Sequence, residues 1–212
     1  MAVYIIVAII AYLIGSINFS IIISKKMAGF DVREKGSGNA GTTNVLRSVG
    51  KKAAALTLIG DILKGIVPIL IAVLCGKIVK NADSALLVQL AAICAILGHT
   101  YPIFFGFKGG KGVATSLGIL LIINWQIGLV CLVFALVLMI LTRMVSLGST
   151  AAAILLPVLT IFAIGKENYI ISGNYIVFSI IMAVIVLFNH RSNIKRILEG
   201  KENKISFKKV EK

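Results

Sequence analysis

The stretch AVYIIVAIIAYLIGSINFSIIIS, which runs from Ala2 to Ser24, contains no charged side chain. An α-helix needs about 20 mainly apolar residues to cross the hydrocarbon core of a bilayer, so this stretch is long enough to span one. It also lacks the basic region that precedes the apolar part of a cleavable secretory signal. We therefore predict a membrane-spanning helix here rather than a signal that is removed.

Six further apolar segments follow the first one. They cover Ala53–Val79, Ser84–Phe105, Val113–Ile123, Ile127–Leu141, Ser146–Gly165 and Tyr169–Phe188. The 212 residues are 58% hydrophobic and only 14% charged, with a mean hydropathy of +1.01. Soluble domains contain about 45–50% apolar and about 25% charged residues. Composition and long apolar runs together predict a single all-α polytopic membrane domain over residues 1–212.

The basic residues favour seven spans over six. Val113–Ile123 and Ile127–Leu141 are short, and together they could instead form one tilted helix. With seven spans, most of the 22 Lys and Arg residues share one side of the membrane, including those of the tail that follows His190. With six spans, that basic tail would face the other side. Because cytoplasmic loops are enriched in Lys and Arg, we predict seven transmembrane helices with the N-terminus outside and the C-terminus cytoplasmic.

The net charge of +14 raises the alternative of nucleic-acid binding. A nucleic-acid-binding protein gathers Lys and Arg on one soluble face or helix. Here the basic residues lie between or after the apolar runs, where they set topology and face anionic lipid. Cys75, Cys94 and Cys131 each lie alone in an apolar run, without the paired Cys or His of a metal site. We therefore expect neither a nucleic-acid partner nor a bound metal.

In this topology the glycine-rich and polar segments all fall on the cytoplasmic side. These segments are residues 35–47, 98–115, 142–149 and 190–202. Polar backbone at membrane depth is tolerated only where it is buried in protein or lines a cavity. Because neighbouring helices pack side by side, their ends on one side can meet. We predict that these segments converge into a single active site.

The first polar segment contains GSGNAGTTNVLR, from Gly36 to Arg47. It includes a GxGxxG pattern, but no buried strand precedes it, so we exclude a dinucleotide-binding fold. Glycine-rich backbone can direct several N–H groups at one anion, and an arginine is suited to bidentate phosphate binding. An ordinary polar loop is the alternative interpretation. The candidate phosphate ligands are Gly36, Ser37, Gly38, Asn39, Gly41, Thr43, Asn44 and Arg47.

The second segment contains FKGGKGVAT, from Phe107 to Thr115. It is not a P-loop, because Gly112 stands where the Mg²⁺-binding Ser or Thr would follow the lysine. Glycines and a lysine at the start of an apolar helix offer an anion free amides, the helix dipole and a positive charge. For the lysines alone, the alternative is a role in setting topology. The candidate ligands are Lys108, Gly109, Gly110, Lys111 and Gly112.

The third segment begins with HRSNIKR, from His190 to Arg196. If the last helix continues through it, His190, Asn193 and Arg196 lie near one face. A histidine and an asparagine there could orient a hydroxyl nucleophile or hold an acyl carbonyl. The alternative is a basic tail that binds lipid headgroups, which accounts for the lysines but not for His190 and Asn193. Arg143 and Ser146, in the segment before, could add to the same anion site.

Three ionisable residues inside the apolar segments are predicted to have structural roles. Asp61 and Lys64 are three positions apart, so on a helix they can neutralise each other. Ionisable residues at such depth are candidates for function, but we prefer an ion pair that supports the preceding loop. A single histidine at a helix end, such as His99, is more often a hydrogen-bonded structural residue than a catalyst.

Taken together, the three segments resemble the signature motifs of the bacterial acyl-phosphate:glycerol-3-phosphate acyltransferases, the PlsY family. The motifs correspond to Gly36–Arg47, Gly98–Thr115 and His190–Glu202, and the resemblance extends over essentially the whole chain. Tyr101 and Ile197 stand where the family often has Phe and Leu, and neither change affects a polar role. The resemblance implies a multi-pass protein of the bacterial cytoplasmic (inner) membrane with seven transmembrane helices and its active site on the cytoplasmic side.

The same resemblance implies the reaction and its residues. A fatty acyl group would move from acyl-phosphate to the 1-hydroxyl of glycerol 3-phosphate, giving 1-acyl-glycerol 3-phosphate and phosphate, the first step of phospholipid synthesis. No cofactor, metal or coenzyme A would take part. The partners would be these two substrates, membrane lipid, and an enzyme that supplies the acyl-phosphate. The implied catalytic residues are Ser37, Arg47, Lys111, His190 and Asn193, with Gly109–Gly112 on glycerol 3-phosphate and Glu202 in a supporting role.

Two other classes of membrane protein are alternatives. A transporter for a phosphorylated solute would also use intramembrane charge and interrupted helices, but it usually shows internal repeats and a polar site near the midplane. This chain has no evident repeat, and its polar motifs gather at one end of the predicted spans. A scaffold protein would not need three dense polar motifs. Product formation distinguishes the enzyme from both.

Overall fold

The computed structural model describes residues 1–162 and 175–205, and within these ranges it contains helices and loops but no β-strand. The α-helices are α1 (Ala2–Gly15), α2 (Phe19–Ala28), α3 (Thr42–Ser48), α4 (Lys51–Ile78), α5 (Ser84–Thr100), α6 (Val113–Ile123), α7 (Trp125–Thr142), α8 (Val145–Phe162), α9 (Tyr175–Asn189) and α10 (Arg191–Leu198). Two 3₁₀ helices, η1 (Val32–Glu34) and η2 (Ile103–Phe105), lie in the loops between them. The predicted all-α class is confirmed.

The described residues contain five helical segments that are long and apolar enough to cross a membrane. These are Ala2–Ala28, Lys51–Ile78, Ser84–Phe105, Trp125–Thr142 and Val145–Phe162. A sixth span results if α9 and α10, bent by 65° at their junction, are taken together. The helix α6 is apolar but only 11 residues long. Within the described residues, the seven predicted apolar segments are therefore helical in the predicted order, whereas their lengths support five or six spans. The predicted limits Gly165 and Tyr169 lie outside the described residues.

The N-terminal apolar run is interrupted, although the sequence predicted one continuous helix there. Its first helix, α1, ends at Gly15, and α2 begins only at Phe19. Asn18 caps α2, because its side-chain oxygen accepts hydrogen bonds from the Ile21 amide at 3.2 Å and from the Ser20 hydroxyl at 2.6 Å. Asparagine is a favoured N-cap because it satisfies amides that have no partner within the helix. A polar residue inside an apolar run thus marks the end of one helix and the start of another.

Small residues allow the central helices to pack closely. The helix α1 packs against α5, and α4 packs against both α5 and α6. A Cβ atom on Gly15 would lie 2.3 Å from the carbonyl oxygen of Ala95, and one on Gly65 would lie 2.3 Å from that of Thr115. No larger residue fits at either crossing without moving the backbone. Close approach at small residues is typical of helix packing in membranes, where lipid provides no hydrophobic driving force.

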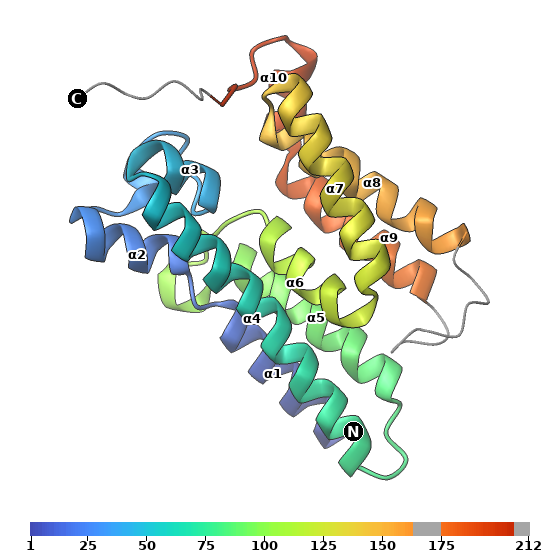
Figure 1. Ribbon diagram of the computed structural model, residues 1–212. Helices are drawn as coiled ribbons and strands as arrows, with labels where there is room; N and C mark the ends of the chain where they lie inside the picture. The colour runs from blue at the N-terminus through green and yellow to red at the C-terminus, as the bar shows by residue number, and fades with distance from the viewer. Residues whose placement is uncertain (163–174, 206–212) are drawn as a thin grey trace.

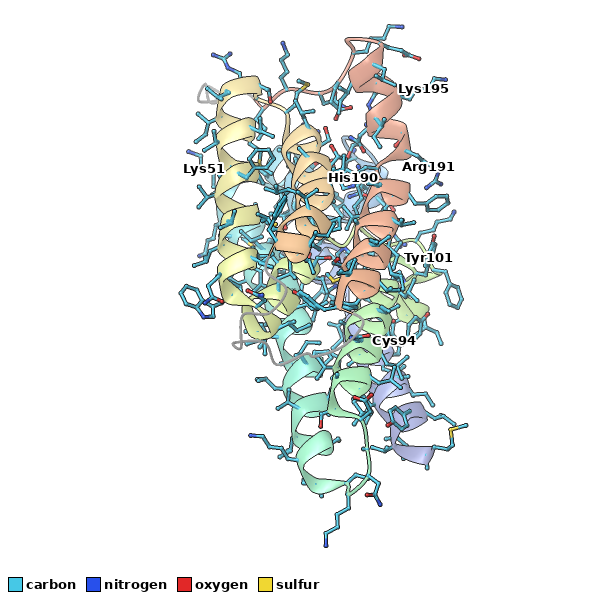
Figure 2. The ribbon with its side chains drawn as sticks, turned by 90° about the vertical axis from the view of Figure 1, so that its right-hand side faces the viewer. Lys51, Cys94, Tyr101, His190, Arg191 and Lys195 are labelled. Atoms are coloured by element: carbon cyan, nitrogen blue, oxygen red, sulfur yellow. The ribbon has the colours of Figure 1, made fainter. Side chains whose placement is uncertain are left out.

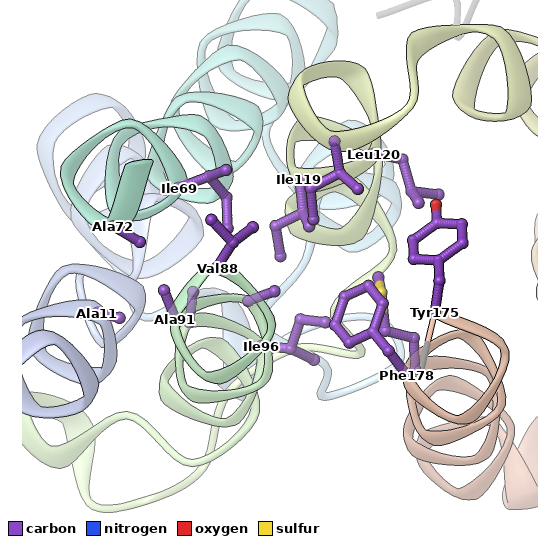
Figure 3. Close-up of a cluster of buried hydrophobic side chains, with 14 of the residues drawn as sticks. Ala11, Ile69, Ala72, Val88, Ala91, Ile96, Ile119, Leu120, Tyr175 and Phe178 are labelled. Atoms are coloured by element: carbon purple, nitrogen blue, oxygen red, sulfur yellow. The ribbon is translucent and has the colours of Figure 1, made fainter. Parts of the chain in front are cut away.

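The buried core joins these helices to α7, α8 and α9. Figure 3 shows Ile69, Val88 and Ile119 facing one another, with Phe178 close to Ile96 on the other side of the cluster. Their side chains are at most 2% exposed. The many exposed apolar side chains of the outer faces are expected where a helix contacts lipid.

The helices bring the three polar motifs to one end of the molecule. Figure 1 shows α2, α3 and α10 at the same end, opposite the N-terminus and the turn between α4 and α5. At that opposite end the Asp83 amide donates a hydrogen bond to the Tyr4 hydroxyl at 2.8 Å. Because α5 and α6 meet through the loop 101–112, the second motif also lies toward the end that carries α3 and α10.

Candidate active site

The third motif lies where the chain bends between α9 and α10. His190 is the N-cap of α10, and Asn193 lies in the first turn of that helix. In Figure 2, His190 points to the inside of the molecule, whereas Arg191 points outward and Lys195 lies further along α10. Nδ1 of His190 lies 2.8 Å from the carbonyl oxygen of Val186. Because a carbonyl can only accept, Nδ1 carries the proton, and in the neutral ring the lone pair is on Nε2.

A hydrogen-bonded network joins the second and third motifs. Lys111 donates through Nζ to the side-chain oxygen of Asn193. The Asn193 amide nitrogen in turn donates to Oε1 of Glu202 at 2.8 Å. The same oxygen accepts from the Ser146 hydroxyl at 2.9 Å, and Oε2 accepts from Nε of Arg196 at 2.8 Å. The predicted convergence of these segments is thereby confirmed. Glu202 is at the centre of the network rather than at its edge.

Positive charges outnumber negative charges in this network. The pKa of Lys111 is lowered to about 8, chiefly by burial and also by the positive charges of Arg196 and Arg47, while Glu202 opposes the shift. Burial raises the pKa of Glu202, but hydrogen bonds from Asn193, Ser146 and Arg196 outweigh that effect and the pKa is lowered. Three cations therefore act together near one carboxylate. The excess positive charge favours the binding of anions.

The first motif reaches the network through Arg47. Nη2 of Arg47 donates to the backbone carbonyl of Asn203 at 3.3 Å, which connects α3 to the chain beyond α10. The Ser37 side chain is exposed at this end, and Arg47 is exposed as well. Gly41 caps α3, and Thr43 lies in its first turn, half-buried like Asn39. Of the predicted donors in this motif, Arg47 is thus the one whose charge acts directly on Lys111.

Asn44 has a different role from the predicted one. Its amide nitrogen donates to the carbonyls of Val32 and Lys35, each at 2.9 Å, and its oxygen accepts from the Ser37 amide at 2.9 Å. The residue is 1% exposed, so it holds the loop in shape rather than presenting a donor to a ligand. Gly36 adopts φ +60°, and a Cβ there would lie 2.2 Å from the Asn44 oxygen. Only glycine fits this turn.

The second motif also departs from the prediction. The amides of Gly109 and Gly110 donate to the carbonyls of Thr100 and His99, at 3.0 and 3.1 Å. These two amides are therefore already used, and they anchor the loop to the end of α5 instead of facing an anion. Gly112 caps α6 with φ +86°, and Lys111 directly precedes it. Lys111 thus supplies the positive charge at the start of α6.

An arginine that the sequence analysis missed ties the first motif to the second. Nη1 of Arg33 donates to the carbonyls of Phe105 at 2.7 Å and Lys108 at 3.1 Å. The Asp31 carboxylate pairs with the same guanidinium at 2.9 Å, and this pairing lowers the pKa of Asp31. The Lys108 side chain is exposed, so the contribution of this residue to the loop is its carbonyl. The sign of this role in the sequence is the placement of Asp31 and Arg33 two positions apart, just before the first motif.

A buried polar cluster packs against the glycine loop of the second motif. Asp61 and Lys64 form the predicted ion pair, with Nζ 2.9 Å from Oδ1 and both side chains at most 2% exposed. Lys64 also donates to the Ile17 carbonyl at 2.7 Å, at the break between α1 and α2. His99 lies with Nδ1 3.7 Å from Asp61, and its Nε2 is close enough to Gly110 that a Cβ there would lie 2.2 Å away. The cluster fixes the position of the glycine loop.

The polar segment 142–149 lies at the turn between α7 and α8, where it meets the chain that follows the third motif. Arg143, which separates these helices, has φ +60° and an exposed side chain. Its carbonyl accepts a hydrogen bond from the Ile205 amide at 2.8 Å. The chain after Gly200 therefore crosses from α10 over this turn, and contacts Arg47 on the way. We refer to residues 201–205 as the C-terminal strap.

An apolar cleft opens next to this polar network. It is lined by α6, α7, α8 and α9 and contains about 630 Å³ of empty space, counting its open side. Val113 and Val186 line it at the end that adjoins Lys111 and His190. Its polar lining residues are Ser116 and Ser149, and the remainder is aliphatic, glycine or sulfur-containing. The arrangement therefore combines a cationic polar site with a slot suited to a hydrocarbon chain.

Comparisons with known proteins agree with this arrangement. A family profile described as glycerol-3-phosphate acyltransferase matches residues 5–200. The chain belongs to the glycerol-3-phosphate acyltransferase family. A relative of that name from Clostridioides difficile (strain 630) is 45% identical over 206 residues, covering 97% of each chain. One from Neisseria meningitidis serogroup C (strain 053442) is 44% identical over 196 residues, covering 92% of this chain and 94% of the relative.

Solved structures of the family share the whole fold. The crystal structure of PlsY (YgiH), an integral membrane glycerol 3-phosphate acyltransferase, in its glycerol 3-phosphate form is 39% identical, with a TM-score of 0.83 and 96% of both chains covered. Its lysophosphatidic acid form is 37% identical with a TM-score of 0.81, covering 96% of this chain and 95% of that one. The resemblance found from the three motifs is confirmed. The protein is thus a multi-pass membrane protein of an acyltransferase family that serves phospholipid synthesis.

Proposed function

We propose that this protein transfers a fatty acyl group from acyl-phosphate to the 1-hydroxyl of glycerol 3-phosphate. The products are 1-acyl-glycerol 3-phosphate and inorganic phosphate. The observation that carries the proposal is the position of Lys111, Arg196 and Arg47 beside His190, at the polar end of an apolar cleft. Both substrates are phosphate esters or anhydrides, and one of them carries a long hydrocarbon chain. A cationic site joined to an apolar slot matches both features.

Because acyl-phosphate is already an activated donor, the protein mainly has to align the two substrates. The hydroxyl oxygen of glycerol 3-phosphate attacks the acyl carbonyl carbon, the bond from that carbon to the phosphate oxygen breaks, and phosphate leaves. The hydroxyl proton passes to His190 or to the phosphate. His190 suits this step because its Nδ1 is held by Val186, which leaves the Nε2 lone pair to accept a proton. Correct positioning of two bound reactants can lower a barrier by about 7–11 kcal/mol.

The cations bind the phosphate groups of the two substrates, and the cleft binds the acyl chain. Lys111, with Asn193 beside it, holds glycerol 3-phosphate, while Arg47 and Ser37 hold the phosphate of the donor. The acyl chain lies in the cleft between α6 and α9. Each buried methylene contributes about 0.8 kcal/mol, so a long chain binds strongly even to a shallow slot. Asn193 is fixed by Glu202, which supports a positioning role for that carboxylate.

We further propose seven membrane passages, with the N-terminus outside and the active site on the cytoplasmic side of the bacterial inner membrane. The short α6 makes one passage and α7, which follows it after Asn124, makes the next, while α9 provides the last. Support comes from α3 and α10, whose basic residues lie at one end of the molecule. The cytoplasmic enzyme that makes acyl-phosphate is then a partner. Labelling of single cysteines at Lys80 and Lys195 in sealed cells tests this: outside reagent should reach only the first.

The test of the reaction uses the purified protein in lipid, supplied with palmitoyl phosphate and glycerol 3-phosphate but no metal or coenzyme A. Phosphate release and lysophosphatidate are measured together. We expect turnover by the natural protein and its loss in Arg47→Ala and Lys111→Ala. Lys195→Ala is the matched control, because that side chain is 79% exposed and forms a surface ion pair with Glu199. Well-folded protein that forms no lysophosphatidate would contradict the proposal, and uptake of glycerol 3-phosphate into vesicles would then indicate a transporter.

A further inference from the structure

We propose that the closed end of the apolar cleft limits the length of the acyl chain that this protein transfers. The inference rests on the proposed acyl transfer and adds a determinant of substrate selectivity. It names residues of the cleft wall on α6, α7 and α8 that lie outside the three polar motifs.

The cleft has a defined axis. On each of three helices, lining residues seven positions apart mark two levels of the cleft: Val113 and Leu120, Ala135 and Gly128, Ser149 and Leu156. Close contacts show that these levels match from helix to helix. A Cβ on Gly128 would lie 3.2 Å from Cβ of Leu120, and one on Gly148 would lie 2.5 Å from the Ala135 carbonyl oxygen. Seven residues of α-helix correspond to about 10.5 Å.

The end far from the polar network is closed by core residues. Beyond Leu120 on α6, beyond Gly128 on α7 and beyond Met182 on α9, the next inward residues are Ile123, Ile127 and Phe178. All three are at most 6% exposed, and none lines the cleft. Leu120, which belongs to the same buried cluster as Phe178 and lies near Tyr175 in Figure 3, forms part of this floor. A chain that enters beside His190 therefore meets packed side chains after a fixed distance.

The length of the cleft sets how many carbon atoms of an extended chain fit inside it. Carbon–carbon bonds of about 1.5 Å advance an extended chain by about 1.25 Å per carbon, so 10.5 Å accommodates roughly eight carbons. Met139, one helical turn above Ala135, extends the wall by about 6 Å, or roughly five more carbons. Small residues keep the passage open in between, because Ala153 projects from α8 one turn below Ser149.

Two substitutions should move the limit in opposite directions. Ala153→Leu fills the middle of the cleft and should favour shorter chains, whereas Leu156→Ala removes part of the floor and should favour longer ones. Ala151→Leu is the matched control, since it makes the same change on the same helix at a position that does not line the cleft. Each methylene excluded from an apolar wall weakens binding by about fourfold. Exclusion of two or more carbons predicts a change of at least about tenfold.

The experiment measures kcat/KM with acyl phosphates of 8, 12 and 16 carbons for the natural protein and the three variants. We expect the ratio of 12 to 8 carbons to fall at least tenfold in Ala153→Leu, the ratio of 16 to 12 carbons to rise in Leu156→Ala, and neither to change in Ala151→Leu. A folding defect would lower all rates together and leave the ratios unchanged. Ratios that are equal in all four proteins would overturn the length limit while leaving the acyl transfer intact.

A binding measurement keeps the two proposals separate. If the natural protein transfers no acyl group, the proposed function fails. The length limit is then judged from the binding of 1-acyl-glycerol 3-phosphates of 8, 12 and 16 carbons to the same four proteins in lipid. Affinity that shifts toward shorter chains in Ala153→Leu and toward longer chains in Leu156→Ala supports the limit. Identical affinities in all variants refute it.

Discussion

Replacement of Glu202 by glutamine should destabilise the protein and impair the site at once. Glutamine keeps the size of the side chain but offers one acceptor oxygen in place of two. If that oxygen keeps the bonds from Asn193 and Ser146, the new NH₂ group must face Nε of Arg196, which is also a donor. The carboxylate side chain is only 4% exposed, so water cannot readily take its place.

The expected loss follows from the bond to Arg196. A hydrogen bond to a charged group contributes about 1.5–3 kcal/mol, and its loss should lower Tm by roughly 3–12 °C in a protein of this size. Thermal unfolding in detergent, together with kcat for acyl transfer, measures both effects. We expect kcat to fall as well, because Asn193 loses the group that orients it toward Lys111.

Glu199→Gln is the matched control for this change. The side chain of Glu199 is 40% exposed and pairs with Lys195 and Lys201 at 4.0 and 3.7 Å. Surface ion pairs of this kind contribute about 0–1 kcal/mol, so little change is expected. If Glu202→Gln melts no lower than Glu199→Gln and turns over normally, the central role assigned to Glu202 is wrong.

The pH dependence provides an independent check on Glu202. Its pKa is lowered in the folded protein relative to the ordinary glutamate value of 4.5. Such a group contributes stability above the unfolded pKa, and the contribution is lost as the pH falls through the lower folded pKa. The difference in Tm between the natural protein and Glu202→Gln should therefore be constant near neutral pH and shrink below about pH 4.5. A difference that persists in acid would indicate that packing, not charge, is responsible.

Three further predictions concern other residues of the site and its support. Lys111 is cationic below its pKa of about 8, so kcat/KM for glycerol 3-phosphate should fall as the pH rises through that value, and Lys111→Arg should remove the fall. Asp61→Asn should destabilise the protein by about 3–5 kcal/mol because it leaves Lys64 charged and unpaired inside the bundle, and adding Lys64→Met should restore most of the Tm. Asn44→Ala should lower both Tm and activity through three lost hydrogen bonds, while Asn39→Ala at the half-buried neighbouring position should have a smaller effect on Tm.

The features that the sequence predicted correctly depend on residue type and order. Apolar runs identified the helices, because lipid allows no other structure to satisfy the backbone of a spanning segment. The meeting of Arg47, Lys111 and Asn193 followed from charge parity, which placed their segments on one side. The number of spans was harder to predict. The eleven residues of Val113–Ile123 are apolar enough for a span but too short for one, and hydropathy alone does not resolve that case.

The features that the sequence did not predict depend on backbone groups. Arg33 binds carbonyls of Phe105 and Lys108, more than seventy positions away, and a carbonyl leaves no mark in a sequence. The amides of Gly109 and Gly110 were expected to be free, yet both bond to the end of α5. The glycines there are required by close packing against His99 rather than by a ligand. A glycine-rich motif thus indicated a functional loop while giving no sign of which amides remained available.

The C-terminal strap explains why a residue so late in the chain is central to the site. The Asn203 carbonyl accepts from Arg47 of the first motif, and Ile205 bonds to the turn before α8. Glu202, between α10 and these contacts, binds Asn193 and Ser146 together. The two cationic segments repel each other through Lys111 and Arg47, so the strap supplies the attraction that keeps them close. Its loss should therefore separate the phosphate-binding groups before it unfolds any helix, and activity should be lost at a lower temperature than helical structure.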